Sequence, residues 1–246
     1  MRGRDKMGYL ISGITDRCTS KIHVNQDKRG AIRLYDVNRT EILLALVADG
    51  ISNAFEGKYA SYNTVLWLLK WAEKYFQKNA FVISNVAAEI QKQLAKYNNL
   101  LNAYSEKESD TDTCCTVCGI ATDGNDLLIF NAGDSRVYEL QNDYAPRQLT
   151  KDDIAADGHS IAMHIGGKTD GEIVVNFSRD RFNNNSIYYI CTDGMYRRLD
   201  FNEWNSQLFS VSDAKDYENL LQNMLKHVRT KGEKDDVTAM ILIGSD

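Results

Sequence analysis

A series of short apolar segments, interrupted by two long helical patterns, constrains the fold of this chain most strongly. The apolar segments are rich in Ile, Val, Leu and Tyr and have the lengths of β-strands. They are Gly8–Ile14, Ala31–Tyr35, Glu41–Ala48, Thr113–Thr122, Asp126–Asn131, Arg136–Leu140, Glu172–Phe177, Ser186–Cys191 and Val237–Ile243. Helical spacing covers about Lys58–Phe76 and Asn85–Tyr104, between the third and fourth strands, and about Ala214–Arg229 near the C-terminus. Consecutive strands with clustered helices predict an α+β fold in which antiparallel sheets pack between helices.

The chain is expected to form a single domain over residues 1–246. Its 246 residues are 43% hydrophobic and 26% charged, which is enough for a sizeable core. Pro146 is the only proline, and no Gly/Ser-rich linker, repeat or low-complexity tract divides the sequence. The sequence therefore favours one domain over two.

The charge balance narrows the choice of partners. The net charge is -5, with acidic residues spread along the chain. A nucleic-acid-binding protein would more often carry a basic face, so no nucleic acid partner is expected. An acidic protein that acts on phosphates needs another source of positive charge, and metal ions held by carboxylates would provide it.

The N-terminus and the cysteines indicate a cytoplasmic protein without a membrane partner. The apolar stretch Gly8–Ile14 is too short for a signal peptide, and no apolar run is long enough to cross a bilayer. The five cysteines, an odd number, show no secreted disulfide framework and should be free thiols. Cys115 and Cys118 form a C-x-x-C, but no second pair stands at zinc-ligand spacing. Buried core residues are the favoured interpretation.

Aspartates at the ends of predicted strands are the candidate functional residues. An Asp-Gly pair usually makes a tight turn, and Asp123-Gly124 fits that interpretation because strands flank it. Asp49-Gly50 and Asp193-Gly194 end apolar strands with no strand following at once, and Asp27 and Asp235 each stand just before a strand. Oxygen-only ligands are typical of Mg²⁺ or Mn²⁺ rather than zinc. The spacing alone leaves a metal site and solvated turn acids equally open.

Five segments, in order, resemble motifs of the type-2C (PPM) protein serine/threonine phosphatases. Val47–Ser61 looks like V-x-D-G-x-G-G-x-x-x-G-x-x-A-S, and Asn131–Tyr138 matches N-x-G-D-S-R-x-Y almost letter for letter. Gln148–Asp153 resembles L-T-x-D-H, Ile190–Tyr196 resembles L-x-S-D-G-L-W, and Asp235–Thr238 resembles D-N-x-T. The matches span nearly the whole chain, and its short length resembles the compact bacterial-style members.

The resemblance implies a fold and a two-metal site. The fold would be a four-layer αββα sandwich, with two central, mostly antiparallel sheets flanked by helices. By position, Asp49 would bridge two Mn²⁺ or Mg²⁺ ions, and the carbonyl of Gly50 would ligate one of them. Asp193 and Asp235 would hold the other ion.

Two more aspartates join the implied site. Asp27 would contact metal directly or through water. Asp134 would help to form a weaker third metal site, although Asp134-Ser135, between two strands, could equally make a simple turn. Neither assignment follows from spacing alone.

The implied reaction is hydrolysis of phosphoserine or phosphothreonine by a water that bridges the two cations. In the family an arginine upstream of the first acid clamps the phosphate. Lys21 is nearest to that place, and Arg17 is the alternative. A lysine would give a point charge without the bidentate fork of arginine. A solvated basic residue is an equally good interpretation.

The sequence also departs from the family pattern. Ser52-Asn53-Ala54 replaces the glycine pair and the following histidine, so the family's general acid is absent at Ala54 and a metal-bound water would protonate the leaving group. Asp236 stands where the family often has Asn. Thr150–Ile161 is short where many members carry a longer flap, so substrate contacts there should be reduced. His159 and His164 match no motif position and have no assigned role.

The leading hypothesis is an active metal-dependent phosphatase of phosphorylated proteins. The altered loop after Asp49 favours an alternative, a catalytically weak relative that serves as a regulatory or binding module. A phosphatase of small phosphorylated metabolites is a third hypothesis, which the sequence does not separate from the first. The sequence gives no indication of the oligomeric state.

Overall fold

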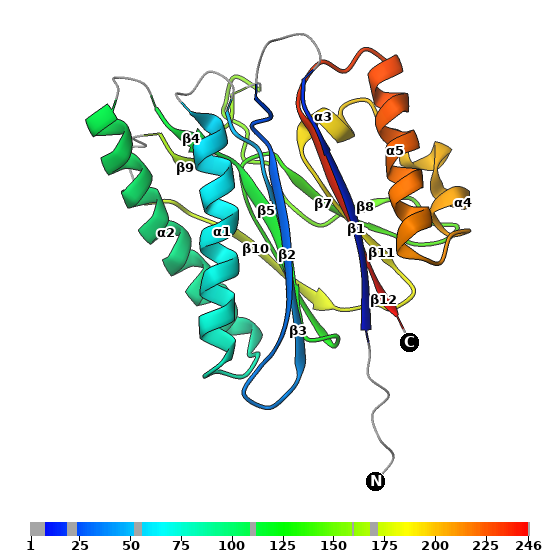
Figure 1. Cartoon of the computed structure of the whole chain (residues 1–246), viewed down its shortest axis with the longest axis horizontal. Coiled ribbons are helices and arrows are strands. Elements are labelled where there is room, and N and C mark those ends of the chain that lie inside the picture. Colours follow the sequence, from blue (N-terminus) through cyan, green and yellow to red (C-terminus); the bar gives the residue numbers. More distant parts are fainter. Residues whose placement is uncertain are drawn as a thin grey trace.

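Two five-stranded sheets packed face to face form the centre of the molecule, and helices cover both outer faces (Figure 1). The computed structural model describes residues 8–18, 24–51, 56–108, 112–158, 160–167 and 172–245. Within these residues, every pair of neighbouring strands is antiparallel. The predicted α+β class and the αββα layering are confirmed.

The first sheet has the strand order β10-β6-β5-β3-β2. Its strands are β2 (Lys28–Tyr35), β3 (Glu41–Ala48), β5 (Val117–Thr122), β6 (Asp126–Ala132) and β10 (Asn176–Arg181). Both faces of β3 are buried, because Leu44 and Leu46 pack toward the helices whereas Leu43 and Ala45 join the core between the sheets. The continuous apolar run of β3 is what a strand covered on both faces requires.

Two long helices form the outer layer on this first sheet. They are α1 (Gly57–Phe76) and α2 (Ile83–Glu108). On α1, the side chains of Val65, Leu68 and Ala72 recur at helical spacing and are fully buried. Gly30 on β2 allows close approach, since a Cβ there would lie 2.6 Å from Cγ1 of Val65 and 2.8 Å from Cδ1 of Leu69.

The second sheet has the strand order β1-β12-β11-β7-β8. Its strands are β1 (Gly8–Asp16), β7 (Arg136–Leu140), β8 (Arg147–Gln148), β11 (Ile187–Cys191) and β12 (Val237–Ser245). Its outer layer contains α3 (Asp193–Tyr196), the 3-10 helix η1 (Phe201–Glu203), α4 (Asn205–Leu208) and α5 (Ala214–Thr230). Leu221 and Met224 of α5 share a buried cluster with Tyr189 and Ile241 of the sheet.

A two-stranded sheet lies beside the ends of α1 and α2. It pairs β4 (Cys114–Cys115) with β9 (Ile165–Gly166). The amide of Gly166 donates to Oδ1 of Asn98 on α2, at 2.7 Å, and Gly50 forms an isolated bridge with Cys115. This small sheet therefore joins the helical layer to the loop that follows β3.

The strand predicted at Glu172–Phe177 is displaced, because it shares only Asn176 and Phe177 with the observed strand β10. Residues 172–175 have no regular secondary structure, and the strand is Asn176–Arg181. Ile173 and Val175 are buried, which explains the apolar signal. Their backbone is paired with a side chain of α2: Gln91 Nε2 donates to the carbonyl of Ile173 at 2.7 Å, and the amide of Val175 donates to Gln91 Oε1 at 3.0 Å.

The strand predicted at Thr113–Thr122 is interrupted at Thr116, which separates β4 from β5. Cys115 and Cys118 are buried free thiols, in agreement with the core interpretation. The structure adds short elements that the sequence did not predict, namely β8, β9, α3, η1 and α4. Among the described residues, no helix has the length and apolar character needed to cross a membrane.

Candidate metal and phosphate site

The first sheet brings two of the predicted acids together. Asp49 directly follows β3, and Asp27 directly precedes β2. These strand ends are neighbours because Lys28 pairs with Ala48 in the antiparallel ladder. The two carboxylates therefore lie at the same edge of the sheet.

The second sheet brings the other acids to the same end of the sandwich, the upper end in Figure 1. Asp193 begins α3 just after β11, and Asp235 precedes β12, whose Ala239 pairs with Cys191 of β11. Asp134 lies in the turn between β6 and β7. The site thus draws on both sheets.

The backbone fixes the position of Asp49. Its carbonyl accepts from the amide of Thr116 at 2.8 Å, and its amide donates to the Thr116 hydroxyl at 3.2 Å. The amide of Gly50 donates to the carbonyl of Gln26 at 3.2 Å. A Cβ on Gly50 would lie 2.5 Å from the carbonyl of Gly57, so only glycine permits this approach between the loop and the start of α1.

Asp27 is buried and is held by the second sheet. Its Oδ2 accepts from the hydroxyl of Thr192 at 2.8 Å, and the same hydroxyl accepts from the amide of Thr238 at 3.0 Å. Burial raises the pKa of Asp27 to about 7, with hydrogen bonds from Thr192 and Thr238 opposing the change, and the negative charges of Asp236 and Asp193 adding to it. Thr192, to which no sequence motif pointed, therefore links the two sheets.

Asp193 and Asp134 are also buried. Burial raises the pKa of Asp193 to about 7; the charge of Arg197 opposes this, while Asp134 and Asp235 reinforce it. Burial likewise raises the pKa of Asp134, again opposed by Arg197. The hydroxyl of Tyr196 donates to Oδ2 of Asp134 at 3.4 Å.

Asp49 is the focus of this negative charge. Its pKa is raised well above the usual range, first by burial and then by the charges of four other carboxylates, those of Asp27, Asp193, Asp235 and Asp134. All five acidic side chains in the predicted set are therefore close enough to interact electrostatically. Such mutual repulsion disfavours the ionised forms unless a cation joins them.

The donor set fits a hard divalent cation. The Oδ1 atoms of Asp27, Asp134 and Asp193 are buried without a hydrogen-bond partner among the described residues. Unpartnered buried carboxylate oxygens are costly, and oxygen-only ligands are what Mg²⁺ and Mn²⁺ prefer. In the described part of the chain, however, no three His, Cys, Asp or Glu side chains have the arrangement needed to hold one ion.

Arg197 lies against two of the acids that are predicted to bind metal. Its guanidinium contacts the carboxylate of Asp193, and its Nη1 lies 3.3 Å from Oδ2 of Asp235. Arg197 stands four residues after Asp193, just past the end of α3, so the helical turn directs the side chain back to the acids. An exposed basic side chain of the protein thus pairs with two of the predicted metal ligands, and the sequence motifs gave no sign of it.

Asp236 has a structural role, which its place beside Asp235 did not reveal. Its two carboxylate oxygens accept from the amide of Cys18 at 2.5 Å and from the amide of Gln26 at 2.7 Å. The side chain therefore ties the segments after β1 and before β2 to the start of β12. Both of its oxygens are used, so we assign it no metal.

Other motif residues also support the site from outside. Arg136 forms a fork with Asp152, with its Nη2 2.6 Å from Oδ2, and its guanidinium carbon lies 3.7 Å from the centre of the Tyr196 ring. The amide of Gly133 donates to Oδ2 of Asp153 at 2.9 Å. These contacts fasten the segment after β8 to the turn that carries Asp134.

The basic residues predicted for phosphate are not both described. Arg17 is exposed, and its carbonyl accepts from Nη2 of Arg229 at 3.0 Å. His164, for which no role was assigned, has its Nδ1 2.9 Å from the carbonyl of Gly166. Lys21, Ser52-Asn53-Ala54 and His159 lie outside the described residues.

Residues 16–240 match the protein phosphatase 2C family. This chain belongs to that family. A curated relative, the serine/threonine phosphatase stp of Listeria innocua serovar 6a, is 26% identical over 247 residues, covering 91% of this chain and 85% of the relative. The predicted family and the predicted activity, that of a metal-dependent protein serine/threonine phosphatase, are confirmed.

Solved structures agree on the fold. The serine/threonine phosphatase Stp1 from Staphylococcus aureus has a TM-score of 0.78 at 18% identity, with 100% of both chains covered. The serine/threonine phosphatase of S. agalactiae has a TM-score of 0.76 at 15% identity, covering 96% of this chain and 99% of that one. The catalytic domain of PstP, solved in complex with two manganese ions, has a TM-score of 0.71 at 18% identity, covering 98% and 100%. Dependence on Mn²⁺ or Mg²⁺ agrees with the family.

Proposed function

We propose that this chain hydrolyses phosphoserine and phosphothreonine in proteins at the end of the sandwich where its aspartates meet. The observation that carries the proposal is the group of carboxylates from both sheets, with raised pKa values and unpartnered oxygens. Bringing like charges together in this way costs stability, and a bound cation offsets that cost. The relative from Listeria innocua, named a serine/threonine phosphatase, supports the substrate class.

Each acid has a proposed place in a two-metal site. Two cations, when bound, would activate water and neutralise the phosphoryl oxygens. We assign the bridging position to Asp49 and one ligand to the carbonyl of Gly50, which the backbone holds in place. Asp193 and Asp235 would hold the other ion once Arg197 releases them.

Asp27, Asp134 and one basic residue would complete the site. Asp27, whose Oδ2 is already bonded to Thr192, would contact metal through its unpartnered Oδ1, directly or through water. The unpartnered Oδ1 of Asp134 supports a weaker third metal site beside Asp193. Lys21 would orient the phosphate, with Arg17 as the alternative.

The setting of the reaction is also proposed. We infer that the substrate is a phosphorylated protein and that the enzyme acts in the cytoplasm, since the four buried cysteines, Cys114, Cys115, Cys118 and Cys191, are free thiols. We further propose that residues 1–246 form a single type-2C domain, with neither nucleic acid nor membrane as a partner. A compact, acidic chain is consistent with each of these.

One assay tests the activity. The natural protein should hydrolyse a chromogenic phosphomonoester, and phosphoserine and phosphothreonine peptides, in Mn²⁺ or Mg²⁺, and EDTA should abolish the reaction. Hydrolysis of the aryl ester without any of the peptides would point to a small-molecule substrate instead. Turnover that persists in EDTA would contradict the metal-dependent site.

A second function is favoured by one observation, the pairing of Arg197 with Asp193 and Asp235. If this pairing excludes metal, the chain would be a catalytically weak regulatory or binding module. Calorimetric titration with Mn²⁺ separates the two functions. Saturable binding in the micromolar to low millimolar range favours the enzyme, whereas no heat of binding favours the module.

A further inference from the structure

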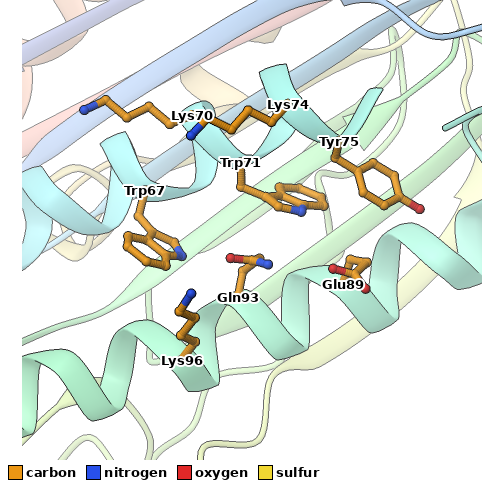
Figure 2. Close-up of a pocket in the computed structure, with 8 residues that line it drawn as sticks. All are labelled: Trp67, Lys70, Trp71, Lys74, Tyr75, Glu89, Gln93 and Lys96. Carbon is orange, nitrogen blue, oxygen red and sulfur yellow. The ribbon is translucent and has the colours of Figure 1, made fainter. Parts of the chain in front are cut away.

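A groove of about 450 Å³ lies between α1 and α2 (Figure 2). Its residues on α1 run from Trp67 to Tyr75, whereas α1 begins beside the candidate site at Gly57. At 1.5 Å per residue, the groove is roughly 15–27 Å further along the helix. The volume is within the range of ligand-binding pockets, about 300–1,000 Å³.

Aromatic rings and lysines alternate along the α1 wall. Trp67, Trp71 and Tyr75 recur at four-residue spacing, and Lys70 and Lys74 stand beside them. The rings of Trp71 and Tyr75 pack against each other, with centroids 5.2 Å apart. The α1 wall therefore offers apolar contact next to positive charge.

The α2 wall adds a third lysine and little opposing charge. Lys96 places its Nζ 5.4 Å from the centre of the Trp67 ring. Glu89 is the acidic residue of the groove, and it is already paired with Lys92 at 3.3 Å. Across the described chain, the three groove lysines, Lys70, Lys74 and Lys96, are exposed and have no ion-pair partner. A net positive groove on a protein of net charge -5 is a local concentration of charge.

The two indole groups carry unsatisfied donors. The Nε1 atoms of Trp67 and Trp71 are buried and have no hydrogen-bond acceptor among the described residues. Figure 2 shows both rings pointing from α1 toward α2. Buried donors without acceptors are uncommon in proteins, so each such group calls for an explanation. A ligand that brings carboxylate or carbonyl oxygens between the helices would provide the acceptors.

We propose that this groove binds an extended acidic segment of a partner protein, in which acidic residues alternate with aromatic or aliphatic ones. Lys70 and Lys74 are one helical turn apart, about 6 Å along the axis. Alternate side chains of an extended chain are about 6.6–6.8 Å apart, so two acids at positions i and i+2 match the two lysines. The side chain between them would face the tryptophan rings.

This occupant fits better than a nucleic acid. The groove contains lysines and no arginine, and Glu89 lies within it. The remainder of the chain is acidic and would repel a long polyanion. A short acidic segment needs only the local charge of the groove. Binding there would hold a partner on the face opposite the helical layer of the second sheet, without occupying the metal site.

The test uses a fluorescein-labelled peptide, Ser-Glu-Phe-Glu-Leu-Glu-Ser, and the full chain. The peptide should bind saturably in an anisotropy titration. It should also change the intrinsic fluorescence, since Trp67 and Trp71 are two of the three tryptophans of the chain. The scrambled peptide Ser-Glu-Glu-Phe-Leu-Glu-Ser has the same composition and should bind more weakly, because no two of its acids stand at positions i and i+2.

Matched charge reversals locate the binding. The double variant Lys70→Glu/Lys74→Glu should weaken binding about tenfold, through the loss of two exposed ion pairs and the added repulsion. The control Lys215→Glu/Lys226→Glu makes the same change of net charge on α5 and should leave the affinity within about twofold. Trp71→Phe, which removes one indole donor and keeps a ring, should weaken binding by less than the double reversal.

The activity of the enzyme serves as an independent readout. Lys70→Glu/Lys74→Glu should hydrolyse a chromogenic phosphomonoester at the natural rate, so a failure of the docking proposal is distinguishable from a failure of the proposed reaction. Equal loss of peptide affinity in both double variants, or no saturable binding up to ~1 mM, overturns the docking proposal. Dimerisation of the natural chain that is lost in Lys70→Glu/Lys74→Glu would identify a second copy as the occupant and overturn it as well.

Discussion

At the scale of single residues, Asp49 has the least favourable electrostatic position among the site acids. It is surrounded by four other carboxylates, and nothing described in its own loop neutralises it. Backbone hydrogen bonds to Thr116 nevertheless hold it in place. The fold therefore maintains a carboxylate where its charge is costly, which is typical of a functional position rather than a structural one.

We predict that Asp49→Asn abolishes metal-dependent hydrolysis and leaves the fold intact. An amide cannot supply the negative charge that a bridging ligand requires. Without metal, removal of one charge from the cluster should raise the midpoint of urea unfolding. The control is Asp123→Asn, in the turn between β5 and β6, where an amide oxygen can still accept from the backbone. Retained Mn²⁺-dependent turnover in Asp49→Asn would contradict the two-metal assignment.

Arg197 gives a second prediction. If it competes with metal for Asp193 and Asp235, then Arg197→Gln should bind Mn²⁺ about two- to fivefold more tightly, as expected for the loss of a partly exposed ion pair. Isothermal titration calorimetry measures this directly. Arg198→Gln is the matched control, because Arg198 lies 3.9 Å from Glu233 and is not paired with Asp193 or Asp235. Unchanged Mn²⁺ affinity with a raised KM would instead assign Arg197 to the substrate.

At the scale of elements, the site depends on strand ends held in register by buried polar groups. Thr192, at the end of β11, bonds to Asp27 beside β2, and so joins the two sheets. Asp236 joins the segments after β1 and before β2 to the start of β12. These contacts connect residues far apart in sequence, so each one fixes the relative positions of several elements.

Asp236 provides a prediction at this scale. Asp236→Ala leaves two backbone amides without their acceptor and should lower the free energy of unfolding by about 1–3 kcal/mol. Asp236→Asn should cost less, since the amide oxygen still accepts one of the bonds. Asp123→Ala removes a carboxylate that also accepts from two backbone amides, but in a partly exposed turn where water can replace it. Urea unfolding that ranks Asp123→Ala as more damaging than Asp236→Ala would refute this interpretation.

Local patterns predicted the elements better than they predicted how those elements meet. The apolar run of β3 and the helical spacing of α1 are visible in the sequence because burial dictates them. The strand expected at Glu172–Phe177 is displaced because Gln91, which is remote in sequence, satisfies the backbone of Ile173 and Val175. Such a partner leaves no periodic signal.

The candidate site shows the same division. The resemblance predicted Asp49 and Asp193 as site residues, because each lies within a motif that is visible in the sequence. It did not predict a role for Arg197. In the sequence this arginine is indistinguishable from a solvated residue, and only the structure shows the acids beside it. Nor did the resemblance show that Asp236 faces backbone amides whereas its neighbour Asp235 faces Arg197.

At the scale of the whole molecule, the candidate metal site lies where the two sheets meet. Asp27 and Asp49 belong to the first sheet, and Asp193 and Asp235 flank strands of the second. The buried cluster between the sheets includes Ile120, Tyr188 and Leu242, which hold the sheets together along their length. At the end of the sandwich that carries the aspartates, by contrast, carboxylates that repel one another replace the apolar contacts between the sheets.

We therefore predict that metal acts as a cross-link between the sheets and stabilises the whole domain. A ligand that binds only the folded chain adds RT ln(1 + [L]/Kd), about 2.7 kcal/mol at a concentration of 100 Kd. Urea unfolding in rising Mn²⁺ should show a midpoint that increases with the logarithm of the Mn²⁺ concentration and returns to its starting value in EDTA. Asp49→Asn should remove most of this dependence, whereas Lys70→Glu/Lys74→Glu, in the distant groove, should keep it. A midpoint that is insensitive to Mn²⁺ and Mg²⁺ would mean that the carboxylates of the two sheets do not share a cation, and the assignment of the site would have to be abandoned.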